Sequence, residues 1–334
     1  MITPASRQRG VALIIALVLM ALATILAVKI GFGGFVERKR TSSILAAEQA
    51  YQFATGAEAL AADVLNQSKQ SSPNEDNLSQ PWAQAPQPIP LRPPNDPEGE
   101  PLGTLEGSLE DQQGRFNLND LLLPDTTNPS QPDATKPDAR RLEVFKRLLE
   151  NLKLDQNLAY KIRDWIDADA NVSFPEGAED AIYTSQNPPY LTGNWPMSST
   201  SELLSLPGFD LEQYKRLAPY VTALPPGTRI NICTAPDLVL DSLTGLNEWQ
   251  RSPGALEKAR KSANGCFPTA QSLNTGLSPA QAQALAPLIT TKSDYFRLTT
   301  LVTLGTTEFT LYSLLYRSPN TNRVTPLLRS FGTP

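Results

Sequence analysis

The sequence contains no histidine and only two cysteines among its 334 residues. Without histidine there is no Ser-His-Asp or Cys-His nucleophile, no imidazole general base and no histidine metal ligand. Two thiols alone cannot fill a structural zinc site, which argues against a zinc protein. The net charge of −5 also argues against a nucleic-acid-binding protein, whose binding face is usually basic.

The N-terminal region has no proline between Ala5 and Ser72, and no charged residue over residues 11–28. Roughly 17–25 apolar residues span a bilayer as a helix, whereas the apolar part of a secretory signal has about 7–15. Arg7 and Arg9 precede the apolar run, so the positive-inside rule keeps the N-terminus in the cytoplasm and sends the rest across. A single-span membrane anchor is one interpretation of this pattern.

Gly10, directly before the apolar run, offers a second interpretation. A basic leader that ends in glycine resembles a type IV prepilin leader, which is cut after the glycine while the apolar helix is retained. Helix formers with apolar residues three and four apart predict one helix over residues 11–70, with its transmembrane part at 11–30. At 1.5 Å per residue this helix is about 90 Å long, which suits a filament stem better than a lone anchor.

The rest of the chain divides by composition into three parts. Residues 71–122 contain a proline-rich loop and then the first strands, which are expected as a hairpin or a pair of short strands with a turn at residues 111–114. Residues 123–224 have helical periodicity and are predicted as an inserted, all-helical domain with an acidic loop. Residues 225–334 are predicted as a sheet domain with a hairpin about Gly305 and an edge strand containing Pro326. The fold class is therefore α+β.

The chain has an even number of cysteines, Cys233 and Cys266, which could pair with each other. If this part of the chain lies outside the inner membrane, a disulfide is their natural state. Closing a loop of this size would stabilise the fold by about 3–4 kcal/mol in the chain-entropy model. Two buried free thiols are the alternative.

The acidic loop holds six carboxylates between residues 164 and 180, with no lysine or arginine among them. Asp167, Asp169 and Asn171 copy the D-x-D-x-N start of a calcium loop, in which alternate oxygens converge on one cation. The match then fails, because Val172 replaces the glycine of an EF-hand and Ala178 replaces its bidentate glutamate. An irregular calcium site closed by Glu179 and Asp180 is the favoured interpretation. A solvated acidic loop and a glycosidase-like carboxylate pair are the alternatives.

A serial set of motifs covers most of the chain: the leader and long helix, GRFNLNDLL, DWIDADA, GAEDAIY, NPPY, SELLSLPGF and ALPPGTRINICTA. The set resembles the K-type minor pseudopilins of the type II secretion system, also called general secretion pathway protein K. The resemblance implies a type IV pilin-like fold, in which the long N-terminal helix packs on an antiparallel sheet and a large helical domain is inserted.

The resemblance also implies the processing, place and role of the protein. Prepilin peptidase would remove residues 1–10 by cutting between Gly10 and Val11, and would methylate the new N-terminus. The chain would cross the inner membrane once, with its C-terminal domain in the periplasm. It would stand without catalytic activity at the tip of the pseudopilus, in contact with the I-type and J-type minor pseudopilins and the major pseudopilin. There it would initiate assembly and support the export of folded proteins across the outer membrane.

Calcium is associated with the same family, and the acidic loop is where we place it. The expected ligands are Asp167, Asp169, Asn171, Glu179 and Asp180, and Asn194 and Glu202 are weaker candidates.

The fifth residue counted from Val11 is Ile15, where pilins usually carry a glutamate that pairs with a neighbouring subunit. A buried carboxylate needs a partner. A subunit with no neighbour ahead of it in the filament has less use for that glutamate, so Ile15 fits a tip subunit.

Two other functions stay open at the level of the sequence. GRFNLNDLL, TRINICTAPDLVLDSL and SELLSLPGF resemble helix-hairpin-helix motifs, which indicates a membrane-anchored DNA-binding protein. The acidic balance argues against it, because phosphate contacts need lysine or arginine. The third interpretation is a periplasmic hydrolase that uses the acidic loop.

Overall fold

The computed structural model describes residues 9–84, 86–93, 95–125, 133–244, 252–263, 265–267, 283–321 and 323–332. Two compact units are distinguished in it. One comprises residues 1–55, 89–105 and 301–309, and the other comprises residues 56–88, 106–300 and 310–334. The predicted leader, residues 1–10, falls mostly outside the described residues.

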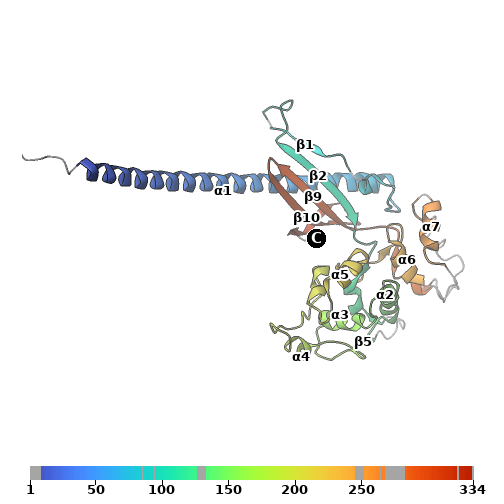
Figure 1. Cartoon of the computed structure of the whole chain (residues 1–334). Helices are drawn as coiled ribbons and strands as arrows, with labels where there is room; N and C mark the ends of the chain where they lie inside the picture. The colour runs from blue at the N-terminus through green and yellow to red at the C-terminus, as the bar shows by residue number, and fades with distance from the viewer. Residues whose placement is uncertain are drawn as a thin grey trace, which may run out of the picture. The chain divides into compact units, whose positions relative to one another are not determined.

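Helix α1 (Arg9–Ser71) runs without a break, as expected of a stretch that contains no proline (Figure 1). Its first part is exposed on all sides, and Val11–Ser71 is the one candidate membrane span within the described residues. Its second part buries a stripe of small and apolar side chains spaced three or four residues apart: Ala50, Ala54, Ala57, Ala61 and Leu65. One helix therefore combines an apolar exposed half with an amphipathic half.

Five strands form the main sheet: β1 (Ile89–Leu91), β2 (Gly103–Asp111), β9 (Tyr295–Leu304), β10 (Thr307–Arg317) and β11 (Val324–Phe331). Their order is β1-β2-β9-β10-β11. Buried and half-buried residues alternate along β9, as expected of a strand with one face on a core. Gly305, at φ +58°, provides the left-handed turn into β10. The predicted α+β, pilin-like fold is confirmed.

Strand β11 lies at the edge of the sheet, as Pro326 predicts. Pro326 stands opposite Leu315, where the register shifts between Leu314 and Leu315. A proline cannot donate to a strand ladder, so the edge and an irregular register are the places where it is tolerated.

Helix α1 is hydrogen-bonded to this sheet at a buried carboxylate and, further along, through Arg317 Nη1, which donates to Leu65 O at 3.1 Å. Glu58, 7% exposed, accepts hydrogen bonds from Ser313 Oγ (2.7 Å) and from two nitrogens of Arg329 (2.7 Å each). A charge-assisted pair of this geometry is among the stronger polar contacts in proteins.

Residues 101–122 contain two strands separated by a turn, as one of the two expectations had it, but the strands do not pair with each other as a hairpin. β2 pairs with β1, and the next strand, β3 (Phe116–Asn117), pairs in parallel with β6 (Val221–Thr222). Asn117 explains the difference, because its side chain accepts from Leu224 N (2.9 Å) and donates to Pro225 O (3.0 Å). The strands at which the chain enters and leaves the insertion, β3 and β6, therefore lie side by side.

The inserted part contains mainly helices: η2 (Leu118–Leu122), α2 (Ala139–Asn151), α3 (Leu158–Ile166), α4 (Asp180–Tyr183), η3 (Thr200–Ser205), α5 (Leu211–Leu217) and η4 (Ala218–Tyr220). It also contains the antiparallel pair β4 (Pro124–Asp125) and β5 (Asp133–Pro137), so the expectation of an all-helical insertion is wrong. Asp138 caps α2 by accepting from Arg140 N. Phe145 is buried and stacks on Phe116 at 4.9 Å between ring centroids.

The C-terminal part is not only a sheet. β7 (Ile230–Asn231) pairs in parallel with β8 (Ile289–Thr290), and α6 (Asp237–Thr244) and α7 (Ala255–Ser262) lie between them in sequence. Cys233 and Cys266 form the predicted disulfide, with a Cα–Cα distance of 4.5 Å. The proline-rich stretch contains a short helix, η1 (Pro81–Ala83). Its Trp82 side chain is buried against Phe296 of β9.

Candidate metal centre

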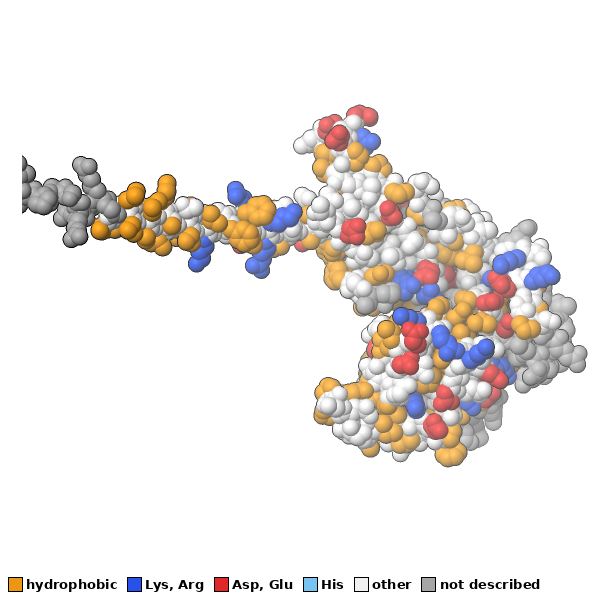
Figure 2. All heavy atoms as spheres, viewed as in Figure 1, with side chains coloured by type: hydrophobic (Ala, Val, Ile, Leu, Met, Phe, Trp, Pro, Cys, Tyr) orange, Lys and Arg blue, Asp and Glu red, His pale blue; other side chains and the backbone are white. Residues whose placement is uncertain are grey.

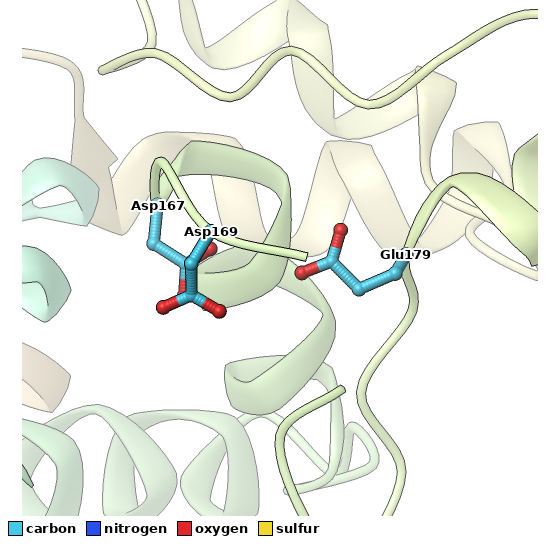
Figure 3. Close-up of side chains that lie close together, drawn as sticks. All are labelled: Asp167, Asp169 and Glu179. Atoms are coloured by element: carbon cyan, nitrogen blue, oxygen red, sulfur yellow. The ribbon is translucent and has the colours of Figure 1, made fainter. Parts of the chain in front are cut away.

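Three carboxylates of the acidic loop lie together. Asp167 follows the end of α3, Asp169 comes two residues later, and Glu179 precedes α4. One oxygen of each lies within 4.8 Å of the others. Figure 3 shows Asp167 and Asp169 side by side, with Glu179 reaching toward them from a separate stretch of chain.

The buried oxygens of this group have no hydrogen-bond donors among the described residues. Asp167 Oδ1 and both carboxylate oxygens of Glu179 are buried and unpartnered, and Glu179 is 4% exposed. Buried polar atoms without partners are rare in folded proteins, and a buried carboxylate requires a compensating charge. The group therefore fits a cation.

The electrostatics agree with this geometry. Burial and the nearby carboxylates of Asp169 and Asp164 raise the pKa of Asp167 from 3.8 to about 6. Burial and the carboxylates of Asp164, Asp167 and Asp169 raise the pKa of Glu179 from 4.5 to about 7. The raised pKa values mean that the metal-free charged form is disfavoured and that a bound cation would relieve the repulsion.

Asp164 organises the loop from inside. Its side chain is fully buried and accepts from Ser173 N at 3.0 Å. Gly177 N donates to Ser173 O at 2.7 Å, and a Cβ atom on Gly177 would meet the Ser173 backbone at 2.6 Å and the Asp164 carboxylate. The loop can close this tightly only with glycine at position 177.

An aromatic cluster supports the other side of the site. The Trp165 ring lies 5.2 Å from that of Tyr183, which lies 5.4 Å from that of Tyr190. Tyr183 is fully buried, so α3 and α4 are fixed relative to each other beside the carboxylates.

The two predicted asparagine ligands differ in burial. Asn194 is anchored beside α3 by a hydrogen bond from its N–H to Trp165 O (2.9 Å), and its Oδ1 is buried and unpartnered. Asn171 is exposed, and its N–H donates to Asp169 Oδ1 at 2.8 Å.

Two further candidates are engaged elsewhere. Asp180 Oδ1 accepts from Thr192 Oγ1 (2.6 Å) and Thr192 N (3.0 Å), and these hydrogen bonds lower the pKa of Asp180. Glu202 closes a capping box on Ser199 and accepts from Trp165 Nε1 at 3.3 Å. The structure therefore does not bring Asp180 or Glu202 into the carboxylate group.

Sequence reasoning missed Asp164 and Gly177 as residues that shape the site. Asp164 was visible as one of the loop carboxylates, and its position three residues before Asp167 on a predicted helix was the available signal.

The donor set consists of carboxylate and amide oxygens. Such hard oxygen ligands in an irregular cage suit calcium, which tolerates variable geometry and takes six to eight oxygens. The described side chains supply part of that number.

Comparisons with known proteins agree with these observations. A family model described as type II secretion system (T2SS), protein K, matches residues 114–226. Type II secretion system protein K of Aeromonas hydrophila is 33% identical over 98% of this chain and 98% of its own length. The chain belongs to the type II secretion system protein K family.

Other members of the protein K family show the same extent of similarity. The protein K of Pectobacterium carotovorum is 34% identical over 98% of this chain and 97% of its own length. A solved structure, the GspK-GspI-GspJ complex of enterotoxigenic Escherichia coli, matches with a TM-score of 0.71 and 26% identity. That match covers 88% of this chain and all of the solved one. Family membership and the apolar half of α1 indicate a pseudopilin anchored by a single membrane pass.

Proposed function

We propose that this chain is the tip subunit of a type II secretion pseudopilus, and that it acts without catalysis. The observation that carries the proposal is the near-complete match in length to protein K relatives, joined to a long helix on a pilin-like sheet. The chain initiates assembly from the inner membrane and supports the export of folded proteins across the outer membrane. Ile15 supports the tip position, because no carboxylate stands there to pair with a subunit ahead.

The proposed partners are I-type and J-type minor pseudopilins, with the major pseudopilin below them. The solved relative was crystallised as a GspK-GspI-GspJ complex, which supports carrying this assembly over. The exposed apolar first half of α1 supports a helix that leaves the membrane to pack among other subunits.

Processing at the start of α1 is the most direct test of the pseudopilin function. Prepilin peptidase would cut between Gly10 and Val11, leaving the folded domain in the periplasm and Val11 methylated. Mass spectrometry of the full chain recovered from membranes should find a mature N-terminus at Val11. A chain that still begins at Met1, or that is cut after the apolar run, would contradict the proposal.

Calcium is the proposed ligand of the acidic loop. Asp167, Asp169, Glu179 and the Asn194 side chain would hold it, which is supported by their unpartnered buried oxygens. The cation would offset two of the three negative charges and would join the end of α3 to the start of α4. The role is structural, because it fixes the loop against the Trp165–Tyr183 cluster.

Terbium luminescence tests this site directly, because Trp165 lies two residues before Asp167 and can sensitise a bound lanthanide. The full chain in detergent should show terbium emission that calcium displaces. Glu179→Gln should weaken terbium binding about tenfold or more, since it removes a buried charged ligand. Glu176→Gln, at an exposed carboxylate of the same loop, is the matched control and should bind as the unaltered chain does.

DNA binding has no support in the structure of the motifs that suggested it. Asn117 and Asn231, at the centres of GRFNLNDLL and TRINICTA, are 2% and 0% exposed. Asn231 Nδ2 donates to Asp76 O, Asp111 Oδ2 and Ser293 Oγ. Both asparagines hold the chain together from inside and are not available to a phosphate.

A further inference from the structure

Two aromatic side chains beside the acidic loop are unusually exposed. Phe174 is 89% exposed and Trp195 is 76% exposed, the two highest values among the large hydrophobic residues of the described chain. Both exceed every residue of the apolar half of α1, where the highest value is 69%, at Met20. Val172 (59%) and Leu191 (62%) are exposed in the same two segments.

Anchored neighbours hold these side chains outward. Ser173, between Val172 and Phe174, donates its N–H to the buried Asp164 carboxylate. Thr192, next to Leu191, is held by Asp180, and Asn194, next to Trp195, is held by Trp165 O. Each exposed side chain therefore projects from backbone that is held at one adjacent residue.

These exposed residues belong to the segments around α4. Figure 2 shows hydrophobic side chains gathered over this end of the inserted domain, where Figure 1 labels α4. Aromatic residues exposed on a fixed scaffold are typical of protein interfaces, where Trp in particular contributes much of the binding energy.

The charge around the aromatics has one sign. Between Arg163 and Lys215 the sequence contains no lysine or arginine, whereas residues 164–180 contain six carboxylates. Arg163 itself lies 4.0 Å from the Asp167 carboxylate. Asp164 and Glu179 are buried, but Asp169 and Glu176 are exposed and Asp180 is half-buried. Glu176 and Asp180 lie outside the group that would hold a cation, so the surface stays acidic with or without one. An anionic membrane would be repelled, and a basic protein segment would be attracted.

We propose that Val172, Phe174, Leu191 and Trp195, with the carboxylates around them, form a docking surface for a protein segment in which Lys or Arg flanks large apolar side chains. The apolar side chains of the partner pack on Phe174 and Trp195, and its cations lie over the acidic loop. The proposal does not depend on where the subunit stands in a filament.

The test measures binding of two synthetic peptides to the full chain in nanodiscs of zwitterionic lipid, with calcium present. In one peptide Lys alternates with Leu and Phe, and in the other Glu replaces every Lys. The basic peptide should bind about tenfold or more tightly than the acidic one, and empty nanodiscs correct for binding to lipid. Combined Phe174→Ser and Trp195→Ser should weaken binding about tenfold, and Glu176→Lys, which changes only charge, should weaken it in the same direction. Leu211→Ser, at a 53% exposed apolar residue of α5, is the matched control and should have no effect.

Several results would overturn the proposal. Equal binding of the two peptides would show that the acidic carboxylates do not select the partner. Unchanged binding by the aromatic double variant would show that Phe174 and Trp195 do not contact it. Binding of the chain to vesicles rich in anionic lipid, lost in the double variant, would assign the surface to a membrane. Self-association that the double variant abolishes would assign it to a second copy of the chain.

Discussion

At the scale of single residues, the acidic loop depends on Gly177 as much as on its carboxylates. Gly177→Ala would place a methyl group against the Ser173 backbone and Asp164. We expect the free energy of unfolding to fall by about 1–3 kcal/mol, as in other overpacked sites, and terbium binding to weaken. Gly107→Ala is the control, because its Cβ atom would meet only Leu298, at 3.8 Å. Thermal unfolding of the two variants followed by circular dichroism checks this, and equal midpoints would contradict it.

The raised pKa values of Asp167 and Glu179 predict how stability depends on pH. Without calcium, the folded chain keeps protons that the unfolded chain has released, so stability falls as pH rises from about 4 to about 7. With saturating calcium this loss should disappear, because the cation stabilises the ionised carboxylates. Unfolding midpoints across this pH range, with calcium and with chelator, measure the difference. Parallel curves would show that the two carboxylates do not bind calcium.

At the scale of elements, Glu58 provides the buried charged link between α1 and the sheet. Glu58→Ala removes the acceptor of Ser313 and Arg329, and should lower the free energy of unfolding by about 1.5–3 kcal/mol. Glu48→Ala, on the same helix, removes only an exposed bond to Gln52 and should change it by less than about 0.5 kcal/mol. Denaturant titration of the two variants compares them. A smaller effect at Glu58 than at Glu48 would show that packing alone holds the helix.

Elements with strong periodicity were predictable from the sequence, and short ones were not. The uninterrupted helix and the β9–β10 hairpin follow from the absence of proline and from Gly305. The parallel pair β3–β6 has two residues per strand and joins positions about a hundred residues apart through Asn117. No local pattern encodes such a pair, because its stability comes from side-chain contacts made only after folding.

The candidate site also has a part that was predictable from the sequence and a part that was not. The D-x-D spacing located Asp167 and Asp169, and the GAED sequence located Glu179. The engagement of Asp180 by Thr192 could not be predicted, because it depends on how residues 184–195 return to α4. Spacing identifies which carboxylates are near in sequence, and the fold decides which of them face one another.

At the scale of the whole molecule, the chain combines a long helix with an apolar half, a pilin-like sheet and an inserted domain for which we propose a bound cation. Each part has a separate role in the proposed assembly: anchoring, packing among subunits, and presenting a surface at the end of the filament. These roles can be carried out only in the complex with the other pseudopilins, and not by the isolated chain.

Reconstitution of that complex tests the central claim most directly. The full chain would be purified in detergent with I-type and J-type minor pseudopilins of the same secretion system, and the mixture separated by size-exclusion chromatography with light scattering. The account predicts a single species that contains all three chains, with this chain present once. Elution of this chain alone, while the I-type and J-type proteins elute together, would contradict it.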